Sequence, residues 1–223
     1  MTAVRIAIPP KITPSNKVSC EYVGPDKLKI RAAHGAFENE CVYFIQGLGK
    51  NAKFSAAETV ETLELAYRNL HVKRFYAQAK EHLLRQLFKV SARRLSRLSH
   101  VHAGLTVGLT ILTISANRWW LGVGDSVMIY SLCKEQLTQI TQKSEGQKKW
   151  VDSNWKEGDM QYYQGLLTVP QLFVVLPKGT ARVLKKKQLT KTLADFAKAD
   201  VHTLSQKLLA LAETHEVFLI KVT

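Results

Sequence analysis

The most apolar part of the chain is the stretch from Ala103 to Leu132, and the other elements are predicted to be arranged around it. Two apolar runs are joined by a short turn at Ala116-Asn117-Arg118, and a second tight turn at Gly124-Asp125-Ser126 leads into a third run, Val127 to Leu132. The first run is rich in Thr, Ile and Val, which suit a pleated, half-buried surface. We therefore predict strands at the centre of a sheet that is covered by another layer.

Shorter strands are predicted upstream of this centre. An alternating run at Lys27 to Ala33 is followed by a predicted turn at His34-Gly35, and Cys41 to Ile45 is a compact buried strand that ends in a predicted turn at Gln46 to Lys50. The first 20 residues hold three of the six prolines and show little periodicity. We expect an extended N-terminal arm over residues 1–26 and one domain over residues 27–223.

Two helices are predicted between these strands and the apolar centre. Ser55 is a good N-cap residue, and Glu58 three residues later completes a capping box. A second helix is predicted from Lys73 to Leu98. Its apolar face consists of Leu83, Leu84, Leu87, Phe88, Leu95 and Leu98.

The C-terminal part contains a polar region, a strand, helices and a final strand. Lys134 to Gln164 is predicted to be dominated by loops, with one short helix. Further elements follow in the order strand Gln171 to Leu176, turn Pro177-Lys178-Gly179, helix from Leu189, helix capped by Asp200, and strand Val217 to Val222. Consecutive strands with short turns imply antiparallel sheets, so we predict a layered α+β sandwich with helix pairs on its outer faces.

Composition fits this architecture. The 223 residues suffice for one large domain or two small ones, and 46% hydrophobic with 22% charged residues is ordinary for a globular protein. No run approaches the roughly 18 apolar residues of a membrane span, and the N-terminal residues lack the pattern of a signal peptide. Three cysteines without close spacing argue against a disulfide framework or zinc site, so a reducing, cytoplasmic location is expected.

The charge narrows the class of partner. Lys and Arg number 32 against 18 acids, a formal net charge of +14, which favours nucleic acid, an anionic membrane surface or an acidic protein, unless the surface is merely soluble and basic. Cations near a helix C-terminus also suit the helix dipole. The candidate residues for binding an anion or partner are Arg93, Arg94, Arg97, Lys185, Lys186 and Lys187.

Two residue pairs suggest other chemistry. His100 and His102 have ligand-like spacing, but no third ligand is evident. Trp119 and Trp120 are adjacent on a predicted strand, so one faces the core, and the other lies under a helix or is available to a base or partner. The cysteines in apolar strands are expected to be buried and inert.

Several motifs together resemble the metal-dependent (type 2C) serine/threonine protein phosphatases. They occur in the family's order from Lys27 to Thr223. The matching segments are Val42 to Lys50 with the following helix, Ala103 to Val107, Asn117-Arg118, Leu121 to Ser126, Gln136 to Thr141, Leu172 to Leu184, and Glu216 to Val222. The resemblance implies a four-layer αββα sandwich of two antiparallel sheets, with a cleft for two Mg²⁺ or Mn²⁺ ions at one edge.

The chain departs from the family where the family has metal-binding aspartates. The first Asp-Gly pair corresponds to Gln46-Gly47, and the second corresponds to Lys178-Gly179. At the third position the family's Asp-Asn is replaced by His215-Glu216 or Thr214-His215. Asp125 is retained, where the family has at most a peripheral ligand, and a role in accepting backbone N–H bonds of its turn is expected.

These substitutions predict that the ions are not bound. Hard divalent cations need clustered oxygen ligands, mostly carboxylates. An ammonium group about 4 Å from a dication would be repelled by roughly 8 kcal/mol at an effective dielectric constant near 20. Without the ions there is no activated water, so we expect no catalytic residue, no bound metal and no cofactor.

The leading hypothesis is a catalytically inactive, phosphatase-like regulatory or scaffolding protein, of a kind widespread in bacterial signalling and secretion. Its degenerate cleft would bind a phosphorylated or acidic protein segment. Two alternatives stay open: a basic nucleic-acid-associated protein, and an active phosphatase with rearranged ligands. The degenerate cleft positions are Gln46, Gly47, Lys50, Asp125, Lys178 and Gly179.

Overall fold

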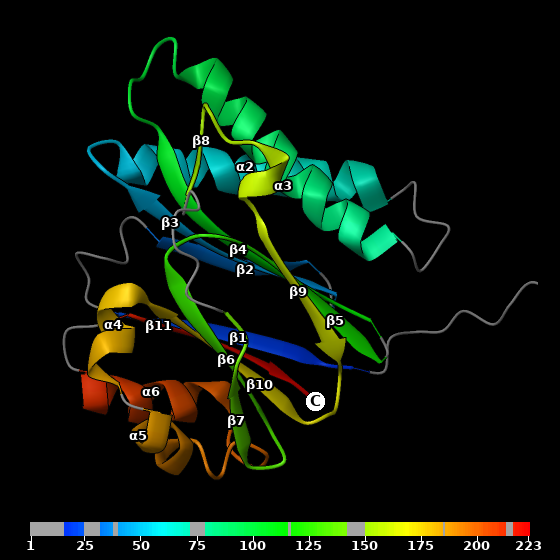
Figure 1. Cartoon of the computed structure of the whole chain (residues 1–223), viewed down its shortest axis with the longest axis vertical. Helices are drawn as coiled ribbons and strands as arrows, with labels where there is room; N and C mark the ends of the chain where they lie inside the picture. Colours follow the sequence, from blue (N-terminus) through cyan, green and yellow to red (C-terminus); the bar gives the residue numbers. More distant parts are fainter. Residues whose placement is uncertain are drawn as a thin grey trace, which may run out of the picture.

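Two antiparallel sheets lie face to face in the computed structural model (Figure 1). It describes residues 16–24, 32–37, 40–71, 79–115, 117–141, 150–184, 186–212 and 216–223. The five-stranded sheet, called sheet A, has the order β1 (Val18–Val23), β11 (Val217–Val222), β10 (Gln171–Pro177), β6 (Val127–Cys133) and β7 (Gln136–Gln139). The six-stranded sheet, called sheet B, has the order β2 (Ala32–Phe37), β3 (Cys41–Leu48), β4 (Thr106–Ile114), β5 (Arg118–Gly124) and β9 (Gln161–Leu166), with β8 (Val151–Asp152) paired to β4.

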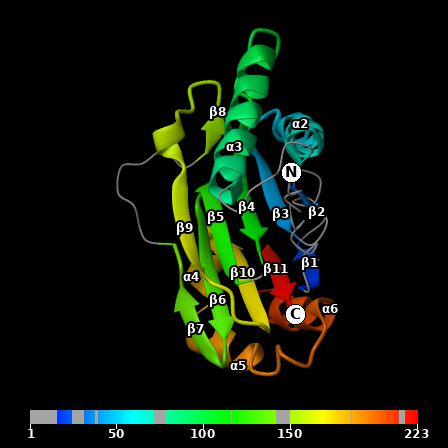
Figure 2. The ribbon, with the colours of Figure 1, turned by 90° about the vertical axis from the view of Figure 1, so that its right-hand side faces the viewer.

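Helices cover the outer face of each sheet. The long helices α2 (Ala52–His71) and α3 (Ala79–Leu98) pack on sheet B, whereas α4 (Lys178–Val183), α5 (Lys186–Thr192) and α6 (Val201–Ala212) lie on the side of sheet A. The short 3₁₀ helix η1 (Glu157–Asp159) lies beside α3. Figure 2 shows the same layers from the side. The predicted αββα sandwich is confirmed. Among the described helices, none has the length and hydropathy needed to cross a membrane.

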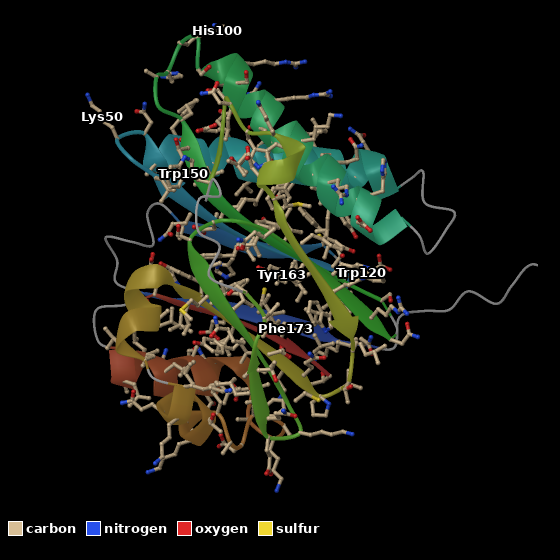
Figure 3. All side chains as sticks on the ribbon, viewed as in Figure 1. Lys50, His100, Trp120, Trp150, Tyr163 and Phe173 are labelled. Carbon is tan, nitrogen blue, oxygen red and sulfur yellow. The ribbon has the colours of Figure 1, made fainter. Side chains whose placement is uncertain are left out.

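Strand alternation divides the core into three layers. In β3, Tyr43 faces the helices while Phe44 faces sheet A, because successive side chains point to opposite faces. Phe173 of β10 packs between the sheets from the other side (Figure 3). We call this middle layer the inter-sheet core. The three strands predicted for the centre of the chain are confirmed as β4, β5 and β6, but they do not share one sheet, because the Asp125-Ser126 turn carries the chain from sheet B to sheet A.

Several sequence predictions of strand ends were wrong. Residues 18–23, assigned to the extended arm, form β1 and pair with β11, while residues 1–15 lie outside the described part. His34 and Gly35 are inside β2 rather than in a turn, and Gln46 and Gly47 continue β3. Hydrogen bonding to a neighbouring strand overrides the turn preference of glycine at both places. The region from Lys134 to Gln164, predicted to be dominated by loops, contains β7, β8 and the first four residues of β9.

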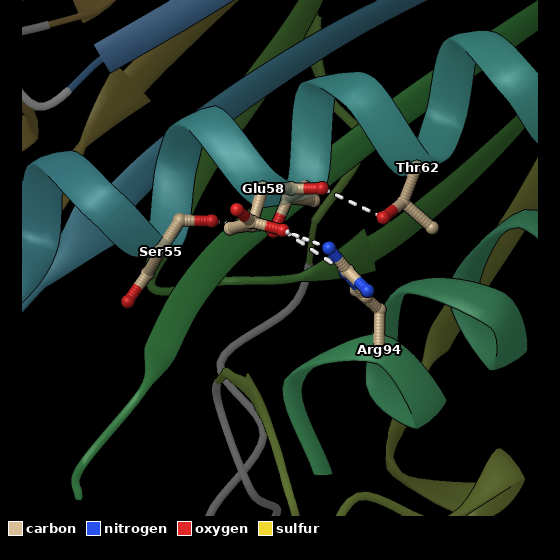
Figure 4. Close-up of polar contacts among 5 residues, drawn as sticks. Ser55, Glu58, Thr62 and Arg94 are labelled. Carbon is tan, nitrogen blue, oxygen red and sulfur yellow. Dashed lines mark hydrogen bonds and ion pairs between the residues drawn. The ribbon is translucent and has the colours of Figure 1, made fainter. Parts of the chain in front are cut away.

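The predicted N-cap at Ser55 was also wrong. Helix α2 begins at Ala52, and the Ser55 N–H already donates to the carbonyl of Asn51 in the first helical turn. Ser55 is fully buried, and its hydroxyl donates to the same carbonyl, 3.0 Å away. Glu58 instead accepts two hydrogen bonds from Arg94 of α3, at 2.9 and 2.7 Å (Figure 4). The capping-box pattern therefore marks an interhelical contact.

Two further predicted helix boundaries agree with the structure, and one does not. Helix α3 ends at Leu98 as predicted, and the predicted start at Lys73 lies outside the described residues. Asp200 caps α6, because its carboxylate accepts the Thr203 N–H at 2.8 Å. Helix α5 begins at Lys186, before the predicted Leu189.

Gly47 lets α2 lie directly on the end of β3. A Cβ atom built at Gly47 overlaps the carbonyl oxygen of Ala52 in the first turn of α2. This oxygen belongs to the backbone, so no side-chain rotation can relieve the overlap. The start of α2 is therefore placed by the absence of a side chain at residue 47.

We expect Gly47→Ala to lower the free energy of unfolding by about 3 kcal/mol or more, since overpacking against backbone is costly. Denaturant unfolding measures this change. Gly158→Ala is the matched control, because a Cβ at Gly158 meets nothing within 4 Å, and a change below about 1 kcal/mol is expected there. Equal stabilities of the two variants would contradict the assigned contact.

Candidate functional site

One end of the inter-sheet core is polar. Gln46 of β3, Asp125 of the turn after β5, Tyr22 of β1 and Glu216 before β11 meet there, and we call them the polar cluster. They follow the alternation of their strands: Gln46 lies on the same face of β3 as Phe44, and Glu216 on the same face of its chain as Phe218. The cluster lies at the edge where the resemblance implies a metal cleft.

Glu216 is the centre of the polar cluster. Its side chain accepts a hydrogen bond from the Tyr22 hydroxyl at 2.8 Å and from Nε2 of Gln46 at 2.6 Å, one on each carboxylate oxygen. Glu216 is 5% exposed and Gln46 is 8% exposed. The Gln46 bond joins sheet B to sheet A. A buried hydrogen bond to a charged group contributes about 1.5–3 kcal/mol, so this bond helps to hold the two sheets together.

Thr180 attaches helix α4 to the same residue. Its hydroxyl donates to the Glu216 carbonyl at 2.9 Å and accepts the Glu216 N–H at 3.2 Å. Helix α4 begins at Lys178 directly after β10, so the backbone of Lys178 and Gly179 lies within two residues of this anchor. The start of α4, which contains Lys178 and Gly179, is thus tied to Glu216 through Thr180.

Asp125 is the second carboxyl group of the cluster. Its Oδ1 accepts the N–H of Ser126, which confirms the predicted turn role, while its Oδ2 is buried without a hydrogen-bond partner among the described residues. The carboxyl group lies on Gly108, where any Cβ would overlap it. Burial raises the pKa of Asp125 to about 7, the Ser126 N–H opposes this rise, and the nearby Glu216 charge adds to it.

Lys50 does not belong to the polar cluster. It lies in the turn between β3 and α2, it is exposed, and its side chain points away from the space between the sheets (Figure 3). The sequence interpretation placed it in the cleft because it took Gln46 to Lys50 as one turn. Since β3 continues to Leu48, Lys50 lies beyond the end of the strand.

The predicted anion-binding residues fall on opposite sides of the sandwich. Arg93, Arg94 and Arg97 are on α3 over sheet B, while Lys186 and Lys187 are exposed on α5 over sheet A. Lys185 lies outside the described residues. Arg94 is already paired with Glu58 at 2.7 Å. The structure therefore does not combine the two basic runs into one patch.

The histidine pair lies outside the strands, and the tryptophan pair is divided between the two faces of sheet B. His100 and His102 lie in the turn after α3 rather than on a strand, and the His102 ring packs on Phe54 with centroids 4.6 Å apart. Trp119 is buried in the inter-sheet core, and Trp120 packs on the helix side of sheet B. Among the described residues no group of three His, Cys, Asp or Glu side chains could hold a metal ion.

The donor set of the polar cluster does not fit a binuclear metal centre. Both oxygens of Glu216 face donors, and Gln46 presents its amide N–H₂ toward the carboxylate where the resemblance implies a ligand. Two carboxylates remain, one of which has a raised pKa because it is buried. Two Mg²⁺ or Mn²⁺ ions require more anionic oxygens than this cluster offers.

Glu216 and Tyr22 were not identified as site residues from the sequence. Glu216 was considered only as one of two alignments of the third cleft position, and Tyr22 lay in the predicted arm. Their contact joins residues 194 positions apart in the chain, which no local pattern reports.

No protein-family model and no curated protein matches the sequence. Solved structures of bacterial serine/threonine phosphatases do have the same fold. The phosphatase PstP/Ppp of Mycobacterium tuberculosis is 13% identical, with a TM-score of 0.71 over 93% of this chain and 97% of that one. Stp1 of Staphylococcus aureus is 14% identical, with a TM-score of 0.73 over 93% and 94%. PppA of Pseudomonas aeruginosa, described as a key regulatory component of T6SS, is 12% identical, with a TM-score of 0.69 over 93% and 96%.

This likeness establishes the fold of the type 2C phosphatases over nearly the whole chain. At 12–14% identity it establishes nothing about activity. The fold implied by the sequence motifs is therefore confirmed, and the chemistry has to be argued from the polar cluster itself.

The raised pKa of Asp125 predicts a pH dependence of stability. The carboxyl group ionises near 3.8 when unfolded and near 7 when folded, so between these values the folded state holds a proton that the unfolded state has lost. Stability should therefore fall as pH rises from about 4 to about 7. Asp125→Asn mimics the protonated acid, and its stability relative to wild type should rise by about 2–4 kcal/mol over that range.

Chemical unfolding at a series of pH values measures this difference. Asp195→Asn is the control, because the Asp195 carboxylate is exposed and the hydrogen bond from Lys207 lowers its pKa. A carboxyl group with a lowered pKa stabilises the folded state at pH values above its ordinary pKa, and this stabilisation is lost as the pH falls. The Asp195→Asn control should therefore not gain stability relative to wild type as the pH rises. A difference between Asp125→Asn and wild type that stays constant with pH would contradict the burial of an ionisable group.

Proposed function

We propose that this chain is a catalytically inactive phosphatase-like protein that acts as a regulatory or scaffolding subunit. The observation that carries the proposal is the hydrogen bond from the Gln46 amide to Glu216, at 2.6 Å. An amide and a carboxylate satisfy each other without a cation. A pair of carboxylates at the same positions would need a cation or a proton between them.

The second substitution supports the same conclusion. Lys178 is the first residue of α4, and α4 is attached to Glu216 through Thr180. The resemblance implies an aspartate there. A cationic residue at this position disfavours a dication electrostatically, and the loss of a carboxylate removes a ligand.

We infer that the retained fold serves binding. The net charge of +14 suits an acidic or phosphorylated segment of a partner protein. PppA, which has the same fold, is described as a regulatory component of T6SS, and this supports a regulatory role for the fold in bacteria. We further propose a cytoplasmic location.

An active phosphatase with rearranged ligands is the second candidate, and one observation favours it. Asp125 matches the family motif and Glu216 supplies a second carboxylate, close enough for its charge to raise the pKa of Asp125. Mg²⁺ can be bound by one or two carboxylates together with substrate phosphate oxygens. Manganese binding and turnover separate the two candidates.

We expect the purified wild-type protein to bind no stoichiometric Mn²⁺ and to show no Mn²⁺-dependent hydrolysis of an aryl phosphate. Metal analysis and a colorimetric assay measure both. Stoichiometric metal together with turnover would establish the second candidate and overturn the first.

A gain-of-ligand variant tests the assignment of the site. Gln46→Asp places a carboxylate against Glu216, where two like charges about 4 Å apart repel by roughly 4 kcal/mol at an effective dielectric constant near 20. Gln46→Asp combined with Lys178→Asp should therefore be less stable than wild type in EDTA and should be restabilised by Mn²⁺, as thermal unfolding can show. Gln136→Asp combined with Lys187→Asp makes the same change in net charge at two exposed positions, on β7 and α5, and this control should not respond to Mn²⁺. A folded double variant without a response to Mn²⁺ would mean that the polar cluster is not the counterpart of a metal site.

A further inference from the structure

A second candidate site lies on the opposite side of sheet B from the polar cluster. Helix α3 and the segment from β8 to η1 line an open pocket with a volume of about 240 Å³. Phe88 of α3 and Trp155 belong to the helix-side core, whereas Gln46 and Glu216 face the space between the sheets. The pocket is lined by Lys89, Ala92, Arg93, Ser96, Ser153 and Trp155.

Helix α3 carries a cation at every fourth position along this side. Arg85, Lys89, Arg93 and Arg97 follow one another at i, i+4 spacing, so they lie on one face of the helix. Arg85 is neutralised by Glu81 at 2.8 Å. Among the carboxylates whose side chains the structure describes, none lies within salt-bridge distance of Lys89, Arg93 or Arg97. Like charges at this spacing destabilise a helix, and a bound anion removes that cost.

The two described aspartates of the facing segment are engaged in its own turns. Asp152 accepts the N–H of Asn154 at 2.8 Å, and Asp159 accepts the N–H of Lys156 at 2.7 Å. These bonds shape the loop that brings Ser153 and Trp155 to the pocket. The Trp155 ring stacks on Phe88 of α3 with centroids 5.9 Å apart, which fixes this wall of the pocket to the helix.

We propose that this pocket binds one phosphoryl group, carried on a phosphorylated serine or threonine of a partner protein. A phosphoryl group has a charge of about −1.5 to −2 and three acceptor oxygens. Lys89 and Arg93 supply charge-assisted donors, and Ser96 and Ser153 supply hydroxyl donors. The proposal does not depend on whether the polar cluster is catalytic, because the two sites lie on different faces of sheet B.

The size of the pocket favours a single phosphoryl group over a nucleotide or nucleic-acid strand. Its volume of about 240 Å³ lies below the roughly 300–1,000 Å³ of sites that hold whole small molecules. The unpaired cations from Lys89 to Arg97 span about 12 Å of one helix face at 1.5 Å per residue. Nucleic-acid binding draws its affinity from contacts to many phosphates along an extended basic surface, and the basic run on α5 lies on the far side of the sandwich.

The experiment measures binding of the phosphopeptide acetyl-Ala-phosphoSer-Ala-amide and of its unphosphorylated form by isothermal titration calorimetry at about 100 mM salt. Wild type should bind only the phosphorylated peptide. K89Q/R93Q should weaken that binding at least tenfold. R85Q/R94Q is the matched control, because it removes the same charge from the same helix at two cations that are already paired, and its affinity should stay within about twofold of wild type. Thermal unfolding of both variants verifies that they are folded.

Other outcomes would overturn the proposal. An equal loss in both double variants would mean that the peptide responds only to net charge. If wild type does not bind the phosphopeptide at millimolar concentration, the proposed site is ruled out. Weakening by Gln46→Asp, with K89Q/R93Q unchanged, would place the peptide in the polar cluster. Tighter binding of an oligothymidine strand, with an affinity that falls steeply with salt, would assign this face to nucleic acid instead.

Discussion

The contact between Gln46 and Glu216 is the constraint on which the rest of the site depends. It is the point at which sheet A and sheet B exchange a buried polar interaction, at one end of an otherwise apolar layer. A buried carboxylate is tolerated only when donors or cations face it. Here the donors are an amide and a phenol, and both are neutral. The sandwich can therefore close at this end without any ion, and this separates the architecture from the chemistry that its relatives in fold perform.

The same contact determines what surrounds it. Because Glu216 is held in place by Tyr22, Gln46 and Thr180, its charge stays near Asp125, whose own carboxyl group rests on Gly108. Burial and this neighbouring charge both favour the protonated form of Asp125. The cluster thus limits its total negative charge in two ways: Gln46 is a neutral amide, and Asp125 ionises only near neutral pH.

Much of the fold was predictable from the sequence because it rests on local periodicity. The three central strands, the cap at Asp200 and the last strand follow from alternation and capping rules that act within a few residues. The polar cluster was predictable only in part. The motif resemblance located Gln46 and Asp125, but the partners of Glu216 lie 170 and 194 residues away in the chain, and their pairing depends on how two sheets are stacked. The capping-box prediction for Ser55 and Glu58 failed for a related reason. Their spacing fits a cap, yet the Glu58 carboxylate accepts a hydrogen bond from Arg94 of another helix.

The total charge of the chain does not tell which cations are paired and which are available to bind an anion. The sequence groups Arg93, Arg94 and Arg97 as one basic run, whereas the fold pairs Arg94 with Glu58 and leaves Arg93 facing a pocket with Lys89. The same pocket gains a hydroxyl and an aromatic wall from residues about 60 positions further along the chain. An excess of cations attracts anions in general, but selectivity requires unpaired cations beside neutral hydroxyl donors in one pocket. That combination, rather than the total of +14, is the physical basis for assigning an anion to this face of the protein.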